Sequence, residues 1–78
     1  MADVRLREIG IGNSAVVSGY DEGKPAYRQK LLSMGLTPGV QVTLRALAPM
    51  GDPVEVELRG FHLTLRKAEA DVLRLRRQ

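Results

Sequence analysis

The chain has 78 residues, with 12 Lys and Arg against 9 Asp and Glu, a net charge of +3 and no cysteine. This length fits a single domain, 1–78, and the missing thiols exclude disulfides, zinc–thiolate sites and a cysteine nucleophile. His62 is the one imidazole available as a base near neutral pH, so we expect no enzyme. No apolar run approaches the ~18 residues of a membrane span. The start of the chain also lacks the apolar core of a signal peptide, so we expect a cytoplasmic protein.

The first predicted strand is Ser14–Tyr20, which has an apolar centre. After a turn, Pro25 suits the first turn of a helix, where its missing N–H is not needed. Gly35 is expected to end this helix, because a glycine just past the last turn readily adopts the left-handed conformation of a C-cap. Leu36 would then fold back toward Leu31, the hydrophobic contact that usually accompanies such a cap.

A second reversal and a strand follow the helix. Thr37-Pro38-Gly39-Val40 has proline in the second position and glycine in the third, which predicts a type II turn. The next strand is expected over 40–48, and its alternation places five apolar residues on one face: Val40, Val42, Leu44, Ala46 and Ala48. Residues 49–53 contain two prolines and a glycine and are predicted to form a loop.

The next prediction is a hairpin. Strands Val54–Leu58 and Phe61–Leu65 flank Arg59-Gly60, which has the length of a two-residue hairpin turn. Such a turn pairs Leu58 with Phe61, Glu57 with His62, Val56 with Leu63 and Glu55 with Thr64. Apolar residues meet apolar ones and polar residues meet polar ones in every pair. Phe61, Leu63 and Leu65 are therefore expected to point inward.

The end of the chain completes the set of elements. One helical turn is predicted for residues 66–70, and the alternation of apolar and basic residues predicts a last short strand over 72–76. Five short strands and one helix indicate a mostly β fold: a small SH3-like five-stranded barrel with one α-helix inserted after the first strand. We expect a closed sheet, because closure hides strand edges in a small β protein without disulfides.

Three segments resemble those of a known family. The run Leu31-Leu32-Ser33-Met34-Gly35-Leu36-Thr37-Pro38-Gly39 is similar to the signature L-x-x-M-G-[LI]-x-P-G. Downstream stand Ala48-Pro49-Met50-Gly51-Asp52-Pro53, then Gly60, then Leu65-Arg66-Lys67-Ala68-Glu69-Ala70. In this order and spacing, the segments resemble the ferrous iron transport protein A family, FeoA, over residues 4–76.

The resemblance implies an SH3-like β-barrel in the bacterial cytoplasm. It also implies a partner, the ferrous iron permease FeoB, which carries a cytosolic G-protein domain. The family is regarded as an accessory to that permease, and no catalytic residues are assigned in it. The resemblance therefore implies contact with the membrane only through the permease.

Three residues are candidates for binding a partner. Arg28 and Lys30 lie on the polar face of the predicted helix, where they form either a docking patch for an acidic surface or an ordinary solvated face. Met50 lies at the predicted tip of the 49–53 loop, and a flexible apolar side chain there suits a binding surface. The alternative for Met50 is a side chain that folds back onto the barrel.

His62 and Glu57 are the candidates for a metal site. The hairpin register places both on the solvent face, and zinc or iron takes imidazole and carboxylate ligands together. Two protein ligands make only a weak surface site, and the alternative is a surface histidine beside a carboxylate. We expect no cofactor to be required.

These observations lead to one functional prediction and one alternative. The chain is predicted to be a small cytosolic accessory or regulatory protein of bacterial ferrous iron uptake, binding the G-protein-containing region of the permease. The alternative is a small basic SH3-like barrel that binds nucleic acid. Two basic blocks, 24–48 and 66–78, favour this alternative, whereas the few aromatic residues disfavour it. We therefore expect no nucleic-acid partner.

Overall fold

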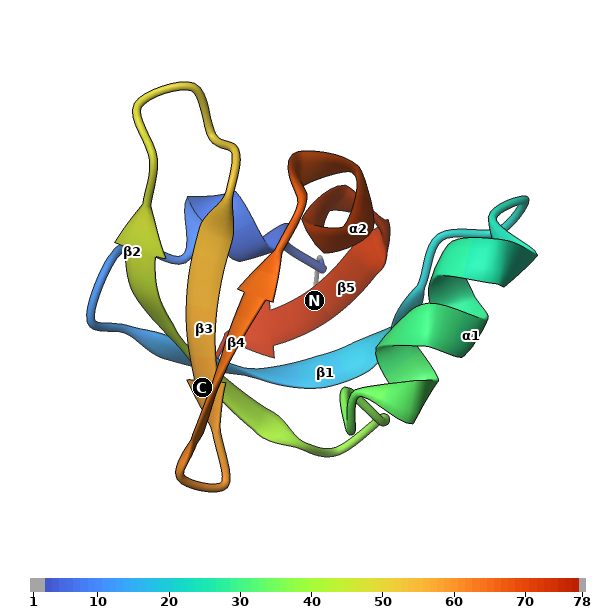
Figure 1. Ribbon diagram of the computed structural model, residues 1–78. Helices are drawn as coiled ribbons and strands as arrows, with labels where there is room; N and C mark the ends of the chain where they lie inside the picture. Colours follow the sequence, from blue (N-terminus) through green and yellow to red (C-terminus); the bar gives the residue numbers. More distant parts are fainter. Residues whose placement is uncertain (1–2, 78) are drawn as a thin grey trace.

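A computed structural model describes residues 3–77 (Figure 1). Five strands and two α-helices follow a short 3₁₀ helix, η1, at Leu6–Glu8. In chain order they are β1 (Ser14–Tyr20), α1 (Pro25–Ser33), β2 (Gln41–Leu47), β3 (Val54–Leu58), β4 (Phe61–Leu65), α2 (Lys67–Val72) and β5 (Leu73–Arg77). The predicted five strands, and the helix after the first of them, are confirmed.

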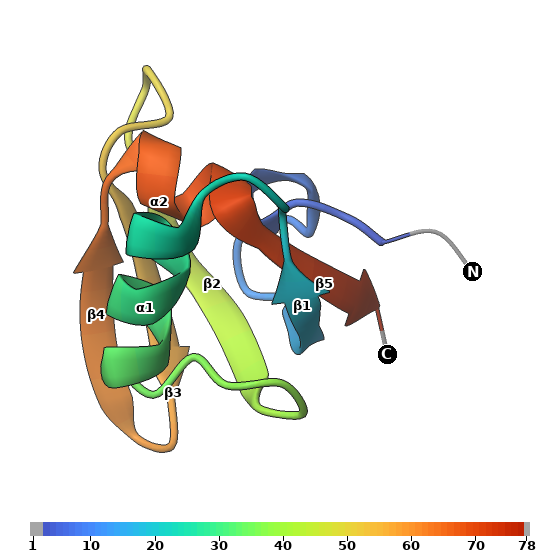
Figure 2. The same cartoon turned by 90° about the vertical axis from the view of Figure 1, so that its right-hand side faces the viewer.

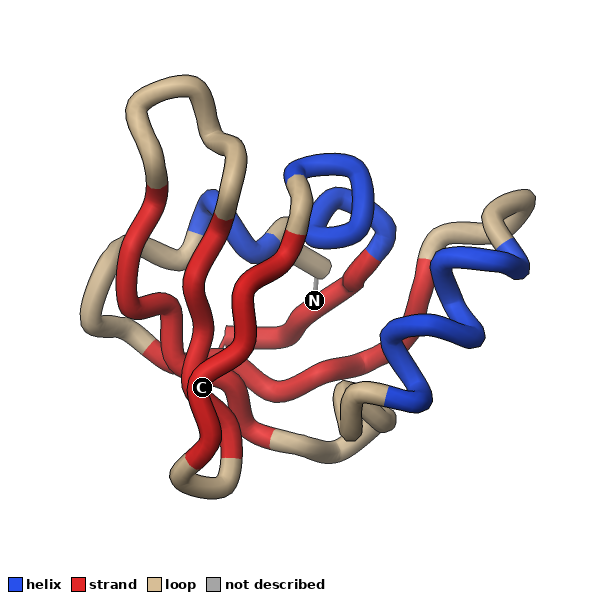
Figure 3. Tube along the Cα trace, in the orientation of Figure 1, coloured by secondary structure: helices blue, strands red, loops and turns tan. Residues whose placement is uncertain are grey.

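The five strands form one antiparallel sheet in the order β4-β3-β2-β1-β5 (Figure 3). The sheet curls around the core, and α2 carries the chain from one end of it to the other (Figure 1). Within residues 3–77, β4 and β5 are not paired with each other. The expected full closure is therefore wrong, because α2 occupies the connection between these two edge strands.

The β5 edge is covered by the start of the chain, a segment in which no helix or strand is predicted. Val4 and Leu75 exchange two backbone hydrogen bonds, of 2.8 and 3.0 Å. Behind them, Leu6 and Ile9 are each only 1% exposed. Charged residues interrupt the apolar ones in this segment, so no strand or helix period marks it, although its two large apolar side chains belong to the core.

The β3–β4 hairpin has the predicted register in all four pairs. Arg59 and Gly60 have φ values of +50° and +81°, as expected for a type I′ turn. The predicted inward position of Phe61 is wrong, because its side chain is 68% exposed. Its partner Leu58 is buried, so the core ends on the β3 side and leaves Phe61 at the margin of the sheet.

Strand β2 departs from simple alternation at Arg45. The pairing with β3 shifts between Leu44 and Ala46, which is a β-bulge. The extra residue reverses the alternation, so Ala46 is exposed and Leu47 packs against the core instead. The inward position predicted for Ala46 is therefore wrong.

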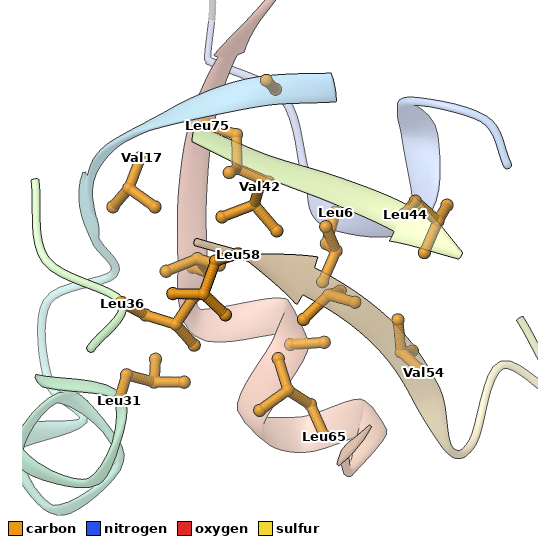
Figure 4. Packing of buried hydrophobic residues seen from close by; sticks show 14 of the residues in the cluster. Leu6, Val17, Leu31, Leu36, Val42, Leu44, Val54, Leu58, Leu65 and Leu75 are labelled. Atoms are coloured by element: carbon orange, nitrogen blue, oxygen red, sulfur yellow. The ribbon is translucent and has the colours of Figure 1, made fainter. Parts of the chain in front are cut away.

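The end of α1 has the predicted cap. Gly35 has φ +92°, and its N–H donates to the Leu32 carbonyl at 3.1 Å. The Leu36 N–H donates to the Leu31 carbonyl at 3.0 Å, which completes a Schellman motif. Leu31 and Leu36 are fully buried, and Figure 4 shows Leu36 between Leu31 and Leu58. The cap thus joins the helix directly to the core.

The predicted type II turn follows at once and is bonded to β1. Gly39 has φ +93°, and the Val40 N–H donates to the Thr37 carbonyl at 3.1 Å. Val17 uses both of its backbone groups here: its N–H donates to Val40 and its carbonyl accepts from Gly39, each at 2.8 Å. The turn therefore places the start of β2 against the middle of β1.

Asp21 joins three distant parts of the chain. Its Oδ1 accepts hydrogen bonds from Nη1 of Arg5 at 2.7 Å and from Nε of Arg74 at 2.9 Å. Arg5 also donates to the Asp71 carbonyl at 3.0 Å. The hydrogen bond from Arg5 is the largest influence on the carboxyl group, and with Arg74 it lowers the pKa of Asp21 despite the opposing effect of burial.

Replacing Gly35 tests the cap. Gly35→Ala should lower the free energy of unfolding by about 1–2 kcal/mol, because an L-residue is strained at this φ. Gly19→Ala is the matched control: Gly19 lacks a positive φ and has open space around it, so the change should stay within about 0.5 kcal/mol. Urea denaturation measures both. Equal losses in the two variants would contradict the role of the cap.

The Asp21 cluster predicts a dependence of stability on pH. Because the pKa of Asp21 is lowered in the folded state, its stabilisation is present above the ordinary value of about 3.9 and is lost as the pH falls through the lowered value. Asp21→Asn should therefore cost about 1 kcal/mol at pH 7 and progressively less below pH ~4. Urea denaturation across this range, with Glu22→Gln as control, measures the effect. A loss that does not change with pH would argue against it.

Candidate partner-binding surface

Arg28, on the exposed side of α1, lies over the aromatic ring of Tyr20, the last residue of β1. Its guanidinium is 5.9 Å from the centroid of the Tyr20 ring, within reach of a cation–π interaction. The Tyr20 hydroxyl donates to the Leu36 carbonyl. Burial raises the pKa of Tyr20, and the positive charge of Arg28 opposes this effect. Arg28 remains exposed beside a hollow of about 400 Å³ that Pro25 and Pro38 also line.

Lys30 has a different environment, although it is only two residues away. Its Nζ forms an ion pair with Oε2 of Glu69, the only buried charged side chain in the described chain, with 4% exposure. The other carboxylate oxygen accepts the backbone N–H of Arg66 at 2.9 Å, at the start of α2. Burial alone would raise the pKa of Glu69, but the hydrogen bonds from Lys30 and Arg66 lower it. Lys30 therefore connects α1 to α2.

The two predicted docking residues thus do not form one patch. Arg28 faces the hollow beside Tyr20, whereas Lys30 lines another hollow, of about 480 Å³, together with Thr64 and Arg66. A sequence pattern shows that two cations share the polar face of a helix. It does not show that one of them neutralises the buried carboxylate of Glu69, which lies 39 residues further along the chain, at the third position of α2.

Met50 lies in the loop between β2 and β3, at the end of β3 opposite the hairpin turn (Figure 1). Its side chain is 83% exposed, so it does not fold back onto the barrel. Ile11 and Phe61 are the other exposed large apolar residues of the described chain, at 62% and 68%. Sequence reasoning missed both, because their apolar character matches that of the core.

His62 lies between two carboxylates on the outer face of the hairpin. Its Nε2 is 3.8 Å from Oε1 of Glu57, as the register predicts, and its Nδ1 is 3.4 Å from Oε1 of Glu55. Glu55 was not singled out from the sequence, although it lies on the same strand face two residues from Glu57. Arg45 donates to the same Glu57 oxygen from Nε at 2.6 Å, so this carboxylate is already paired.

This geometry limits what His62 can bind. The two ring nitrogens of an imidazole point in different directions, and Glu55 and Glu57 each lie beside a different one, so this arrangement does not place both carboxylates around one ion with His62. Among residues 3–77, no group of three or more histidine and acidic side chains is arranged to hold a metal ion. The predicted pair of His62 and Glu57 therefore offers at most two protein ligands, with Arg45 competing for one of them.

Helices in the described range are too short and too polar to cross a bilayer. The curled five-stranded sheet, with α1 inserted after its first strand, places the molecule in the class of SH3-like domains. A model of the FeoA domain matches residues 4–77. The chain belongs to the FeoA family.

A curated relative is similar to most of this chain. The chain is 33% identical over 67 residues to an Fe(2+) transport protein A/Fe(2+) transporter FeoB fusion protein of Porphyromonas gingivalis. That match covers 86% of this chain but only 8% of the fusion protein.

The solved structures cover most of both chains. An FeoA-like protein from Clostridium acetobutylicum has 32% identity and a TM-score of 0.86, with 99% of this chain and 88% of that chain covered. FeoA of Stenotrophomonas maltophilia has 27% identity and a TM-score of 0.78, with 92% and 88% covered. The latter is described as a prokaryotic SH3 domain protein and was solved as a zinc complex.

The different environments of Lys30 and Arg28 can be tested by stability. Lys30→Gln should lower the free energy of unfolding by about 1–2 kcal/mol, because the buried Glu69 carboxylate loses its cationic partner. Arg28→Gln, on the same helix, should cost about 0.5 kcal/mol. Urea denaturation at pH 7 measures both. A larger loss of stability for Arg28→Gln than for Lys30→Gln would contradict the structural role assigned to Lys30.

Proposed function

We propose that this chain is a small, non-enzymatic cytoplasmic accessory protein of ferrous iron uptake. Its partner is the cytosolic, G-protein-containing region of the ferrous iron permease FeoB. The observation that carries this proposal is the P. gingivalis relative, in which the two proteins are described as one fusion. Fusion keeps two domains at high effective concentration, which favours partners that act together.

The surface of the chain supports an interaction role. Met50 and Phe61 are large apolar side chains exposed at opposite ends of β3, and Arg28 is an exposed cation beside Tyr20. Exposed apolar and arginine side chains are typical of protein interfaces. Lys30, in contrast, has a structural partner in Glu69.

The nucleic-acid alternative has weaker support from the same surface. Single-stranded nucleic acid is bound by exposed aromatic rings that stack on bases. Among the aromatic residues of the described chain, Phe61 is exposed, whereas Tyr20 lies beneath Arg28 and Tyr27 packs against the core. Several arginines of the basic blocks are also paired with carboxylates, including Arg45 and Arg74.

The proposal predicts a direct complex. The purified chain should bind the soluble cytosolic region of the permease, and binding should be compared without nucleotide, with GDP and with a non-hydrolysable GTP analogue. Isothermal titration calorimetry measures the affinity, and GTP hydrolysis by the same mixture measures whether the accessory chain alters turnover. Failure to bind in all three nucleotide states would overturn the proposal.

A second proposal concerns His62, which lies near Glu57 and Glu55. We infer that its imidazole and one carboxylate bind zinc or ferrous iron weakly at the surface, with solvent completing the coordination shell. Zinc titration followed by NMR should shift the His62 ring signals and the backbone amide signals of Glu55 and Glu57, and His62→Ala should abolish the shifts of these amides. Equal binding by the His62→Ala variant would exclude this site.

A further inference from the structure

The free edge of β4 has unpaired backbone groups. A two-residue turn closes on a hydrogen-bonded pair, here Leu58 and Phe61, and hydrogen-bonded pairs then alternate with non-bonded pairs along the hairpin. His62 and Thr64 fall in the non-bonded pairs, so their N–H and C=O groups point away from β3. Within residues 3–77 neither residue makes a backbone hydrogen bond to any other segment.

Natural edge strands are usually protected by lysine, proline, a bulge or a covering segment. Strand β5 is covered by Val4, but β4 has the sequence Phe-His-Leu-Thr-Leu and pairs with β3 in unbroken register. Figure 2 shows β4 at the margin of the molecule. The β4 edge is therefore able to accept another strand.

The side chains along β4 favour an apolar companion. Phe61 is 68% exposed beside this edge, and its burial by a neighbouring strand would remove a large apolar area from water. At the other end, Thr64 lines the hollow of about 480 Å³ between α1 and the start of α2. This hollow provides room next to the edge.

Cations lie at both ends of the β4 edge. Arg59 precedes the strand, and Arg66 and Lys67 follow it; none of the three side chains has an ion pair in the described part of the chain. Asp52 lies near the second end, where its carboxylate accepts the Lys67 N–H, so that end still has a net charge of +1. Each end is therefore positive.

This charge pattern distinguishes between two occupants. In an antiparallel pair of two β4 strands centred on Leu63, the Arg59 end of one copy would lie beside the Arg66 and Lys67 end of the other, and like charges brought together in this way repel each other. An extended segment with carboxylates at both ends would instead meet opposite charges. The charges thus favour a partner with acidic residues over a second copy of this chain.

We propose that the β4 edge binds an extended segment of the permease's cytosolic region by strand addition. The segment carries apolar residues at its centre, next to Phe61, and Asp or Glu at both ends, next to Arg59 and next to Arg66 and Lys67. Because a strand rises about 3.3 Å per residue, these acidic residues are about six to eight positions apart. This inference rests on the proposed function and names the docking surface for it.

Two variants test the edge by calorimetry against the permease's cytosolic region. Thr64→Pro removes an outward N–H that β3 does not use. The double variant Arg59→Asp and Arg66→Glu reverses the end charges, and it retains the hairpin because Asp-Gly suits a type I′ turn. Both should weaken binding at least about tenfold, that is, by about 1.4 kcal/mol. Arg76→Glu reverses the charge of one exposed arginine on β5; it is the control for a charge reversal away from the β4 edge and should keep near-wild-type affinity.

The outcomes separate the two proposals. If the wild-type chain does not bind, the proposed function fails, and the inference fails with it. If the wild-type chain binds and the double variant binds equally well, the function stands and the β4 edge is excluded. A similar loss of binding in Arg76→Glu would also exclude it, since net charge alone would then explain the effect. Thermal melting confirms that each variant is folded, and the double variant decides the matter if Thr64→Pro does not fold.

Discussion

The fold depends on the reversal between α1 and β2. The Gly35 cap aligns the carbonyls of Leu31 and Leu32 with N–H groups of the departing chain, and Leu31 and Leu36 enter the core together. The type II turn that follows places Gly39 and Val40 against Val17 of β1. In a chain of 78 residues without cysteine, this backbone pairing provides order that a larger core would otherwise supply.

The two edges of the sheet differ, because the described part of the chain pairs with only one of them. Val4 pairs with β5, and the cluster of Arg5, Asp21 and Arg74 holds the start of the chain beside it. Within the described residues, strand β4 has no such pairing on its outer side, and its outer backbone groups lie between two positive ends. A sheet left open between β4 and β5 thus leaves one edge on which a partner strand can add, whereas a closed sheet would have none.

Charged residues of this chain divide into those that hold the fold and those that remain available. Asp21 and Glu69 each accept hydrogen bonds from two donors, and these bonds keep the pKa of both carboxyl groups low. Lys30 belongs to the first group through Glu69, despite its exposed position on a helix. Arg59, Arg66 and Lys67, which have no ion pair among residues 3–77, belong to the second group, and a partner can use them.

Local features were predictable from the sequence alone. Glycine and proline positions determined the helix cap, the type II turn and the hairpin, because few other residues adopt these backbone conformations, and the turn length determined the hairpin register. The proximity of His62 to Glu57 followed from that register. The three segments 31–39, 48–53 and 65–70, in their order and spacing, indicated the family.

Tertiary structure alone decided the rest. Phe61 alternates like a core residue, yet it lies beyond the end of the core. Ala46 is turned outward by a bulge that alternation does not reveal, and Lys30 is neutralised by a carboxylate distant in sequence. Residue type and spacing determine how each segment folds locally. Which side of a segment is covered, and which charges find partners, depends on segments far apart in the chain and is decided only when they pack together.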